Sequence, residues 1–488
     1  MKKEEFSFAK TIDTVILLTI ICVAFAFRLY KINTPLADLH SWRQADTAAV
    51  GRNFVKQGFD FLHPRYDDLS NVQSGKENPQ GYRFVEFPIY NALFALSSKL
   101  APVFPIEVHG RIVTILFSLV TIGVIYYLAR KEAGRIAAIA ASATFAIMPF
   151  FVFFSRVVLP DPAATSLAFL AIFFLYKALD FESKQFKQFL IFYVLSFISF
   201  ASALLVKPTV IFYALPLLYL FIDRYKISIL KNIWFYLYFV LGFIPLLMWR
   251  QYIQAYPEGI PASGWLITSV NTFEGQKNIF LKPAFFRWIF FERINNYIFG
   301  GYVLVLFIIG ILTKNRRYFL HTILAAALLY LFVFEGGNVQ HEYYQILILP
   351  ALALFVGLGT QFILTNTKNN INRVAAYPIL IIVIILGFSF SYYKVKDYYA
   401  TPSDLPQIAN IIQTLTKEDD KIVTDRLGDT TLLYLANRKG APAVYKSTTE
   451  LKQQGYKYLV TADPHMISDL KKDLKVVFQN DTFILFKL

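Results

Sequence analysis

The stretch "HSWRQADTAAVGRNF", residues 40–54, gathers charged side chains directly after the first long apolar run of the chain. As a helix with about 100° per residue, it places Arg43 and Asp46 on one stripe and Trp42, Ala45 and Ala49 on the neighbouring stripe. Such a helix can lie on the membrane surface with its apolar stripe toward the lipid. A carboxylate such as Asp46 can accept a proton from an attacking group, and a guanidinium such as Arg43 can stabilise negative charge. The alternative for this pair is an i,i+3 surface ion pair with no part in chemistry.

Two further acidic residues stand where apolar runs begin. Glu86, in "YRFVEFPIYNALFAL", can serve as a second base, or it can be a charge that the dipole of the following helix favours. Asp161, in "FSRVVLPDPAATSLAF", can bind a substrate or cap a helix with Pro162 at its first position. Arg156 of the same stretch can hold an anion.

Two more polar groups interrupt the apolar sequence. Lys207 is followed directly by a proline between two short apolar runs. The stretch "EGGNVQHEYYQILILP", residues 335–350, has a glycine hinge and carries His341, Glu342 and Tyr344. A lone histidine at such a place is usually structural, but these clusters together indicate a polar site at one rim of an apolar protein.

The composition shows which elements must position these residues. The chain has 488 residues, of which 56% are hydrophobic and 17% charged, and its mean hydropathy is +0.47. A membrane span needs about 20 mostly apolar residues to cross a layer of ~30 Å. About eleven runs meet this requirement, near residues 12–31, 111–129, 135–154, 162–179, 189–206, 208–222, 233–250, 297–313, 318–335, 345–365 and 374–392. The chain is therefore predicted to be a polytopic α-helical membrane protein.

Basic residues predict the orientation, because loops rich in Lys and Arg remain in the cytoplasm. They gather at the N-terminus and in alternate loops near residues 130–135, 177–187, 224–231, 314–317 and 368–373. We therefore expect a cytoplasmic N-terminus in the cell (inner or plasma) membrane. The net charge of +15 is then a signal of topology and of attraction to membrane lipids, and it requires no nucleic-acid partner. The single cysteine, Cys22, excludes an internal disulfide and a cysteine-based metal site.

Two domains follow from this topology. Residues 1–392 form the transmembrane domain, which includes an outer loop at 32–108 with interfacial helices. Residues 393–488 are richer in Lys, Asp, Gln and Thr, and they form a small exoplasmic α/β domain. Its strands are predicted from apolar or alternating runs, at 421–424, 456–461, 475–478 and 483–488, with a helix at 405–416 and a hairpin turn at "QNDT".

These features together resemble one family of membrane enzymes. Along the chain the features follow one another in this order: the polar outer helix, "EFPIYN", Gly110–Arg111, "SR…PD", "KP", "HEYYQILILPALAL" and the outer α/β domain. Over residues 10–392 it is similar to the GT-C membrane glycosyltransferases. Within them it resembles the branch of the lipid A aminoarabinose transferases and the bacterial relatives of protein O-mannosyltransferases.

The resemblance implies an inverting glycosyltransferase, for a hexose or a pentose, that works on the exoplasmic face. It would move a sugar from a polyprenyl-phosphate carrier to a glycolipid, a cell-envelope glycan or a protein. The family's Asp-Glu pair aligns with Arg43 and Gln44, which are not bases, so Asp46 on the same stripe is the nominated base. Glu86 matches the family's Glu before a proline-rich helix start, although the Lys that follows in the family is Phe87 here.

The remaining candidates would bind the phosphate or the sugar, because fixed cations stabilise a leaving phosphate. They are Arg43, Arg156, Asp161, Lys207, His341, Glu342 and Tyr344. A divalent cation, Mg, Mn or Zn, held by Glu86 and His341 is an alternative clamp on the phosphate.

Two other functions remain open at this point. A transporter or flippase of a lipid-linked saccharide would place ionisable groups near the middle of the membrane or show two related halves. Here the middles of the spans are nearly free of charge and no internal symmetry is visible. A non-catalytic glycan-binding membrane protein is the second alternative, because the Asp-Glu pair is missing.

Overall fold

The computed structural model describes residues 2–181, 185–261, 279–314, 317–366 and 373–488. The chain divides into two compact units. The first comprises Met1–Tyr30, Ile112–Met248 and Ile267–Asp397, and the second comprises Lys31–Arg111, Trp249–Leu266 and Tyr398–Leu488. The second unit thus combines the outer loop with the C-terminal stretch.

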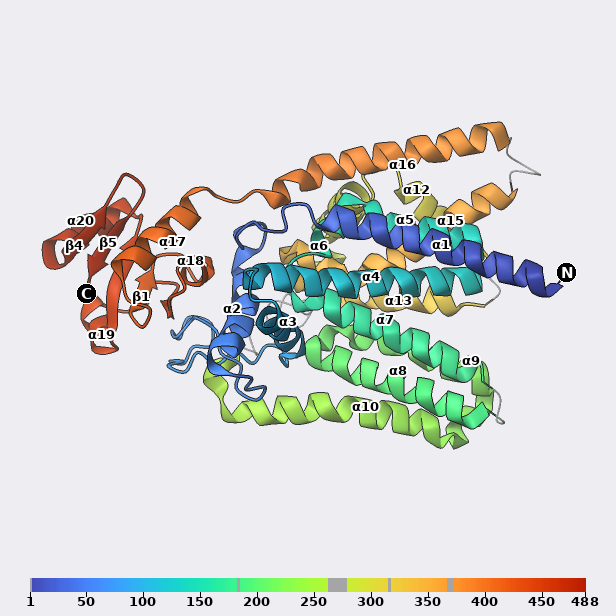
Figure 1. The fold of residues 1–488 in the computed structure, drawn as a ribbon, viewed down its shortest axis with the longest axis horizontal. Helices are drawn as coiled ribbons and strands as arrows, with labels where there is room; N and C mark the ends of the chain where they lie inside the picture. The colour runs from blue at the N-terminus through green and yellow to red at the C-terminus, as the bar shows by residue number, and fades with distance from the viewer. Residues whose placement is uncertain (1, 182–184, 262–278, 315–316, 367–372) are drawn as a thin grey trace. The chain divides into compact units, whose positions relative to one another are not determined.

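The first unit is helical (Figure 1). Its longer helices are α1 (Lys2–Arg28), α4 (Ile106–Glu132), α5 (Arg135–Ile147), α7 (Pro160–Leu179), α8 (Phe186–Val206), α9 (Ala214–Tyr225), α10 (Ile233–Tyr252), α13 (Phe319–Val333), α15 (Leu349–Asn366) and α16 (Arg373–Val395). Shorter helices are α6 (Pro149–Phe154), α11 (Pro283–Phe286), α12 (Leu304–Leu312) and α14 (Glu335–Gln340), and a π-helix spans Arg287–Ile298. The polytopic helical architecture predicted from the sequence is confirmed.

Among the described residues, seven helical segments are long and apolar enough to cross a membrane, fewer than the eleven expected. Prolines account for part of the difference, because they disfavour a helical conformation in the preceding residue. The run 135–154 is divided where Pro149 begins α6, and the run 208–222 begins with a 3-10 turn at Pro208–Tyr213. Gly300 and Gly301, both with positive φ, precede the short α12, and α13 has only 15 residues.

Ion pairs connect several of the basic loops at one end of this unit. Asp13 of α1 binds Arg130 at 3.0 Å and Arg135 at 2.6 Å. Arg317 binds Glu132 at 2.6 Å, and its other amino group lies 2.9 Å from Asp223. These loops therefore share one end, as the count of basic residues predicted. Parts of the loops 177–187, 314–317 and 368–373 lie outside the described residues.

Glycines allow α15 to pack tightly in the first unit. A Cβ at Gly359 would lie 1.8 Å from the carbonyl oxygen of Leu306 in α12, and one at Gly310 would lie 1.9 Å from that of Phe355. Gly357 likewise faces the carbonyl oxygen of Ala137 in α5 at 2.4 Å. Small residues let membrane helices approach each other closely, so dispersion contacts can hold them together in lipid.

The outer loop of the second unit contains α2 (Ser41–Gln57) and α3 (Ile89–Leu100), which pack against each other. The expected helix at residues 40–54 is present. The expectation that its apolar stripe faces lipid is wrong, because Ala45 and Ala49 are buried in protein. Helix α3 instead exposes Leu93, Leu96 and Leu100, a pattern typical of a helix at a membrane interface.

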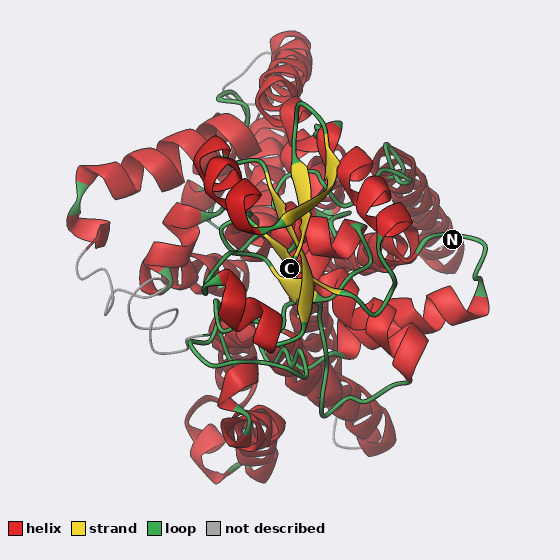
Figure 2. Cartoon of the chain, turned by 90° about the vertical axis from the view of Figure 1, so that its left-hand side faces the viewer, coloured by secondary structure: helices red, strands yellow, loops and turns green. Residues whose placement is uncertain are grey.

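The C-terminal stretch forms a five-stranded sheet in the order β2-β1-β3-β5-β4 (Figure 2). The strands are β1 (Lys421–Thr424), β2 (Gly440–Ala441), β3 (Tyr456–Thr461), β4 (Lys475–Gln479) and β5 (Ile484–Lys487). β1 pairs in parallel with β2 and β3, whereas β5 is antiparallel to β3 and β4. Four strands thus lie where the sequence predicted them, and the turn at "QNDT" is held by Asn480, whose side chain accepts from the amide of Phe483 at 2.9 Å.

Helices cover both faces of this sheet. Ile422 packs with α17 (Asp404–Leu415) and α18 (Thr431–Leu435). The next residue, Val423, packs on the opposite side with α19 (Thr448–Gln453) and α20 (Pro464–Asp473). Successive side chains of a strand point to opposite faces, so this alternation produces two cores.

The outer loop forms an isolated bridge to β2. The amide of Gly440 donates to the carbonyl of Asp67 at 2.9 Å, and the amide of Leu69 donates to the carbonyl of Gly440 at 2.7 Å. The pairing at Asp68 and Gly440 is parallel. Backbone hydrogen bonds therefore join the outer loop to the edge strand of the sheet.

The substitution Gly359→Ala tests the tight helix packing. The new Cβ meets a backbone carbonyl, and overpacking of this kind costs about 1–3 kcal/mol, so the apparent Tm in detergent should fall by several degrees. Gly123→Ala is the matched control, since a Cβ there meets no atom within 4 Å and alanine favours a helix. Equal Tm values for both variants would contradict the packing argument.

Candidate functional site

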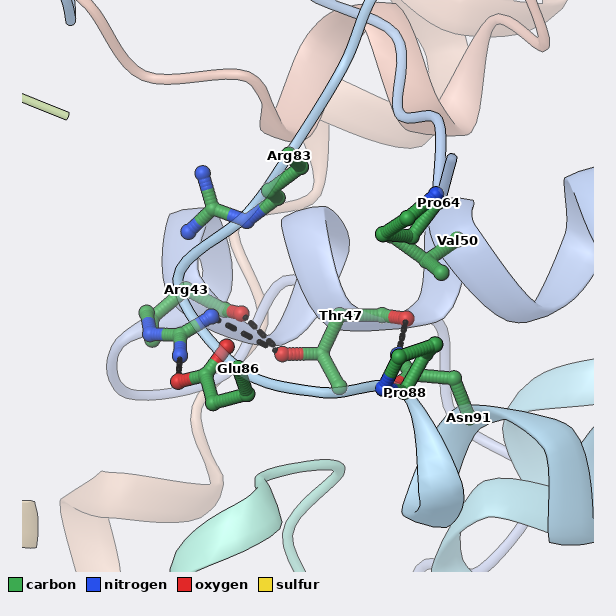
Figure 3. A pocket seen from close by; sticks show the side chains of 8 residues that line it. All are labelled: Arg43, Thr47, Val50, Pro64, Arg83, Glu86, Pro88 and Asn91. Carbon is green, nitrogen blue, oxygen red and sulfur yellow. Dashed lines mark hydrogen bonds and ion pairs between the residues drawn. The ribbon is translucent and has the colours of Figure 1, made fainter. Parts of the chain in front are cut away.

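The second unit contains a pocket lined by two arginines and one carboxylate (Figure 3). It is lined by Arg43, Thr47, Val50, Pro64, Arg83, Glu86, Pro88 and Asn91. Its volume of about 10 Å³ has room for about one water molecule. The residues come from α2, from the start of α3 and from the loop segments between these helices.

Arg43 and Glu86 form an ion pair in this pocket. The guanidinium of Arg43 also donates to the hydroxyl of Thr47, one turn further along α2, at 3.1 Å. The side chain of Asn91 in α3 donates to the carbonyl of Thr47 at 2.8 Å, which connects the two helices at the pocket (Figure 3). Glu86 lies before the first turn of α3, and its partner is an arginine of another segment.

Asp46, the nominated base, is buried behind the pocket. One of its oxygens accepts a hydrogen bond from Thr430 at 2.6 Å, and the other lies 2.9 Å from the guanidinium of Arg83. Burial raises the pKa of Asp46, and the charge of Arg83 offsets part of that effect. Glu86 therefore lines the pocket, whereas Asp46 pairs with Arg83, which lines it.

Arg83 is a pocket residue that the sequence analysis did not single out. Its guanidinium donates to Gln73 at 3.0 Å and lies 4.9 Å from the ring centroid of Tyr66. In Figure 3 it lies on the same side of the pocket as the guanidinium of Arg43. Its position in the sequence, three residues before Glu86, was the only available signal.

The remaining candidates belong to the first unit. Asp161 is buried in the first turn of α7 and pairs with Lys207, which follows α8, at 3.3 Å. The ammonium of Lys207 also lies 5.6 Å from the ring centroid of Tyr344. Sequence positions 161, 207 and 344 are thus brought together. The alternative that Asp161 caps a helix at Pro162 is wrong, since α7 begins at Pro160 and Asp161 makes no capping bond.

Arg156, His341 and Glu342 also lie in the first unit. Arg156 is completely buried after α6. The ring of His341 stacks on Tyr343 at 5.4 Å, and Glu342 lies 3.6 Å from the guanidinium of Arg293. The candidates are therefore divided between the units. Asp161, Lys207 and Tyr344 meet in the first unit, which also holds Arg156, His341 and Glu342, whereas Arg43, Asp46 and Glu86 lie in the second.

The described residues contain no cluster of three His, Cys, Asp or Glu side chains that could hold a metal ion. Of the proposed ligands, Glu86 is paired with Arg43, and a second guanidinium, that of Arg83, lines the same pocket. His341 stacks on an aromatic ring in the first unit. In this arrangement the carboxylate of Glu86 is bound to a guanidinium, so it could hold a divalent cation only after release from Arg43.

Comparisons with known proteins place the fold. Residues 86–249 match the family model described as dolichyl-phosphate-mannose-protein mannosyltransferase. The structure is similar to ArnT from Cupriavidus metallidurans in the apo state, with a TM-score of 0.67 and 14% identity over 98% of each chain. ArnT bound to undecaprenyl phosphate gives 0.67 and 13% identity over 97% of each chain.

A second relative is more distant. The oligosaccharyltransferase from Archaeoglobus fulgidus, solved in complex with zinc and sulfate, has a TM-score of 0.58 and 12% identity. The match covers 92% of this chain and 68% of that one. No curated protein matches the sequence. The fold is therefore the one found in ArnT and in this oligosaccharyltransferase, which confirms the fold expected from the resemblance, and the chain is a multi-pass membrane protein.

Asp68, in the loop between α2 and α3, should make the stability of the folded protein depend on pH. Burial raises its pKa from 3.8 to about 7, and the nearby charge of Asp46 adds to the shift. Between these two pH values the folded state binds a proton that the unfolded state lacks, so stability falls as the pH rises through this window. The Tm should be lower at pH 8 than at pH 6.

Asp68→Asn should flatten this pH profile, because an amide does not titrate yet can still accept from the amide and hydroxyl of Ser70. Asp419→Asn, at an exposed position, is the control and should keep the profile of the unsubstituted protein. A profile that is unchanged in the Asp68 variant would show that this carboxyl does not control stability.

Proposed function

We propose that this protein is an inverting glycosyltransferase that moves a sugar from a polyprenyl-phosphate carrier to an acceptor on the exoplasmic face of the cell membrane. One observation carries the proposal: a pocket with two guanidinium groups and a carboxylate, in a fold shared with an ArnT that was solved with undecaprenyl phosphate. The N-terminus is cytoplasmic and the C-terminal domain exoplasmic, as the basic loops predict.

The two arginines fit the phosphate of the carrier. The pocket has room for about one water molecule, and the pair of Arg43 with Glu86 lies within it. A phosphate group can enter only by replacing Glu86 as the partner of Arg43. Planar guanidinium groups bind phosphate oxygens with two parallel hydrogen bonds, so this exchange keeps Arg43 paired.

The same exchange prepares the base. Glu86, released from Arg43, accepts the proton of the acceptor hydroxyl while the hydroxyl oxygen of the acceptor forms a bond to C1 of the sugar. The bond between C1 and the carrier oxygen breaks, and its electron pair remains on the phosphate, where Arg43 and Arg83 stabilise the charge. A single displacement of this kind inverts the configuration at C1.

The candidates of the first unit complete the proposal. Lys207 is already paired with Asp161 and lies against the ring of Tyr344, so it forms a cationic site of limited exposure. We assign Lys207, Asp161 and Tyr344 to the donor, together with Arg156, His341 and Glu342. Asp46 remains the alternative base. The sugar is a hexose or a pentose, and the acceptor is a glycolipid, a cell-envelope glycan or a protein. A divalent cation, Mg, Mn or Zn, remains the alternative clamp on the phosphate, and the archaeal oligosaccharyltransferase was solved with zinc.

Glu86→Gln tests the mechanism. General-base assistance contributes about 10²–10⁴ in rate, so transfer should fall by about that factor while the protein still folds. The measurement is mass spectrometry of cell-envelope glycolipids and glycans from cells that carry the unsubstituted protein, the variant, or neither. Asp46→Asn compares the two carboxylates directly: a larger loss there than in Glu86→Gln would make Asp46 the base.

Glu77→Gln is the matched control, since Glu77 lies in the same outer loop but pairs with Lys446 at the surface, and it should leave the products unchanged. If glycolipids, glycans and cell-envelope proteins carry identical sugars with and without the protein, the proposed function is wrong.

A further inference from the structure

The C-terminal domain contributes a side chain to the network behind the pocket. Thr430, at the start of α18, donates its hydroxyl to Asp46 at 2.6 Å. The hydroxyl oxygen of Thr430 also lies 3.3 Å from the carbonyl oxygen of Trp42. The other oxygen of Asp46 faces Arg83 at 2.9 Å. Thr430, Asp46 and Arg83 are all buried. Three segments distant in the sequence therefore form one network of polar contacts that ends in the pocket.

The hydrogen bond from Thr430 determines how the carboxylate of Asp46 contacts Arg83. A buried carboxylate needs donors for both of its oxygens, and the loss of one donor leaves an unsatisfied acceptor. With Thr430 on one oxygen, Asp46 presents the other to Arg83. The side chain of Gln73, which accepts from Arg83, also bonds to the carboxylate of Asp46. Without the hydroxyl, the freed oxygen of Asp46 turns to these two groups, and bidentate pairing would draw Arg83 toward Asp46 and away from the pocket.

The rest of α18 holds Thr430 in place without touching Asp46. The hydroxyl of Thr431 donates to that of Ser41 at 2.9 Å. The guanidinium of Arg52 donates to the carbonyl of Tyr434 at 2.7 Å and lies 4.4 Å from its ring centroid. The hydroxyl of Tyr434 donates to Glu107 at 2.6 Å. The contact between α18 and the outer loop is therefore specific along its length.

From this geometry we propose that Thr430 of the C-terminal domain is a positioning residue, which acts through Asp46 to hold Arg83 ready for an anionic ligand. The assignment of that ligand as a polyprenyl phosphate rests on the proposed function. In this arrangement the C-terminal domain sets the affinity of the pocket for phosphate, and Asp46 serves to orient a cation.

The test compares Thr430→Val, Thr430→Ser and Thr431→Val in the full-length protein in nanodiscs. Valine keeps the shape of threonine but lacks the hydroxyl, whereas serine keeps the hydroxyl. Loss of one buried hydrogen bond to a charged group corresponds to about a tenfold weaker Kd. Thr430→Val should show this loss for undecaprenyl phosphate, and Thr430→Ser should restore binding to within about threefold.

Two controls separate positioning from a general loss of structure. Thr431→Val removes a hydrogen bond of the same helix contact and should leave the Kd unchanged. In an Arg83→Gln background, Thr430→Val should have no further effect, because its influence passes through Arg83. Equal losses in the two valine variants, or additive losses with Arg83→Gln, would overturn the proposal.

A second measurement does not depend on the proposed function. Phenylglyoxal modifies accessible guanidinium groups, and mass spectrometry of peptides gives the rate at Arg83. Thr430→Val should change that rate, and Thr431→Val should not; equal rates in all three proteins would overturn the positioning role. If the unsubstituted protein binds undecaprenyl phosphate no better than undecaprenol, the proposed function fails, while the modification rates still decide the role of Thr430.

Discussion

The pairing of buried opposite charges is the constraint on which the second unit depends. Arg43 with Glu86 and Asp46 with Arg83 are both pairs with little access to water. An isolated buried charge costs several kcal/mol, and removing one partner leaves the other uncompensated. Because the partners come from α2 and from the loop before α3, the pairs hold these segments in one arrangement. The same pairs place two guanidinium groups at one pocket.

These pairs also explain how a protein rich in apolar residues keeps reactive groups available. A pair whose partner can be replaced by a ligand is stable without the ligand and reactive with it. Arg43 changes its partner from a carboxylate to a phosphate in the proposed reaction, so its own charge stays paired, and the released carboxylate of Glu86 is neutralised when it accepts the proton of the acceptor. Asp46 has a different part, since one of its oxygens accepts from Thr430 and the other forms an ion pair with Arg83.

Much of the architecture could be predicted from the sequence. Among the described residues, hydropathy located the seven segments that are long enough to cross a membrane, because an apolar helix satisfies its own backbone hydrogen bonds in lipid. Alternation located four of the five C-terminal strands, although β2, with two residues, is too short to leave a pattern. The helix at 40–54 was also predicted, but not its burial, which depends on the α3 and α18 segments that cover it.

The sequence by itself determined the class of fold, the apolar spans and the residue types at the rim, because these depend on composition and local periodicity. Only the tertiary structure decided which charged side chains form pairs with each other. It paired Arg43 with Glu86 and gave Asp46 to Arg83 and Thr430, whereas helical spacing suggested that Arg43 and Asp46 belong together. A buried charge selects its partner by distance in space, and the segments that provide these partners are far apart along the chain.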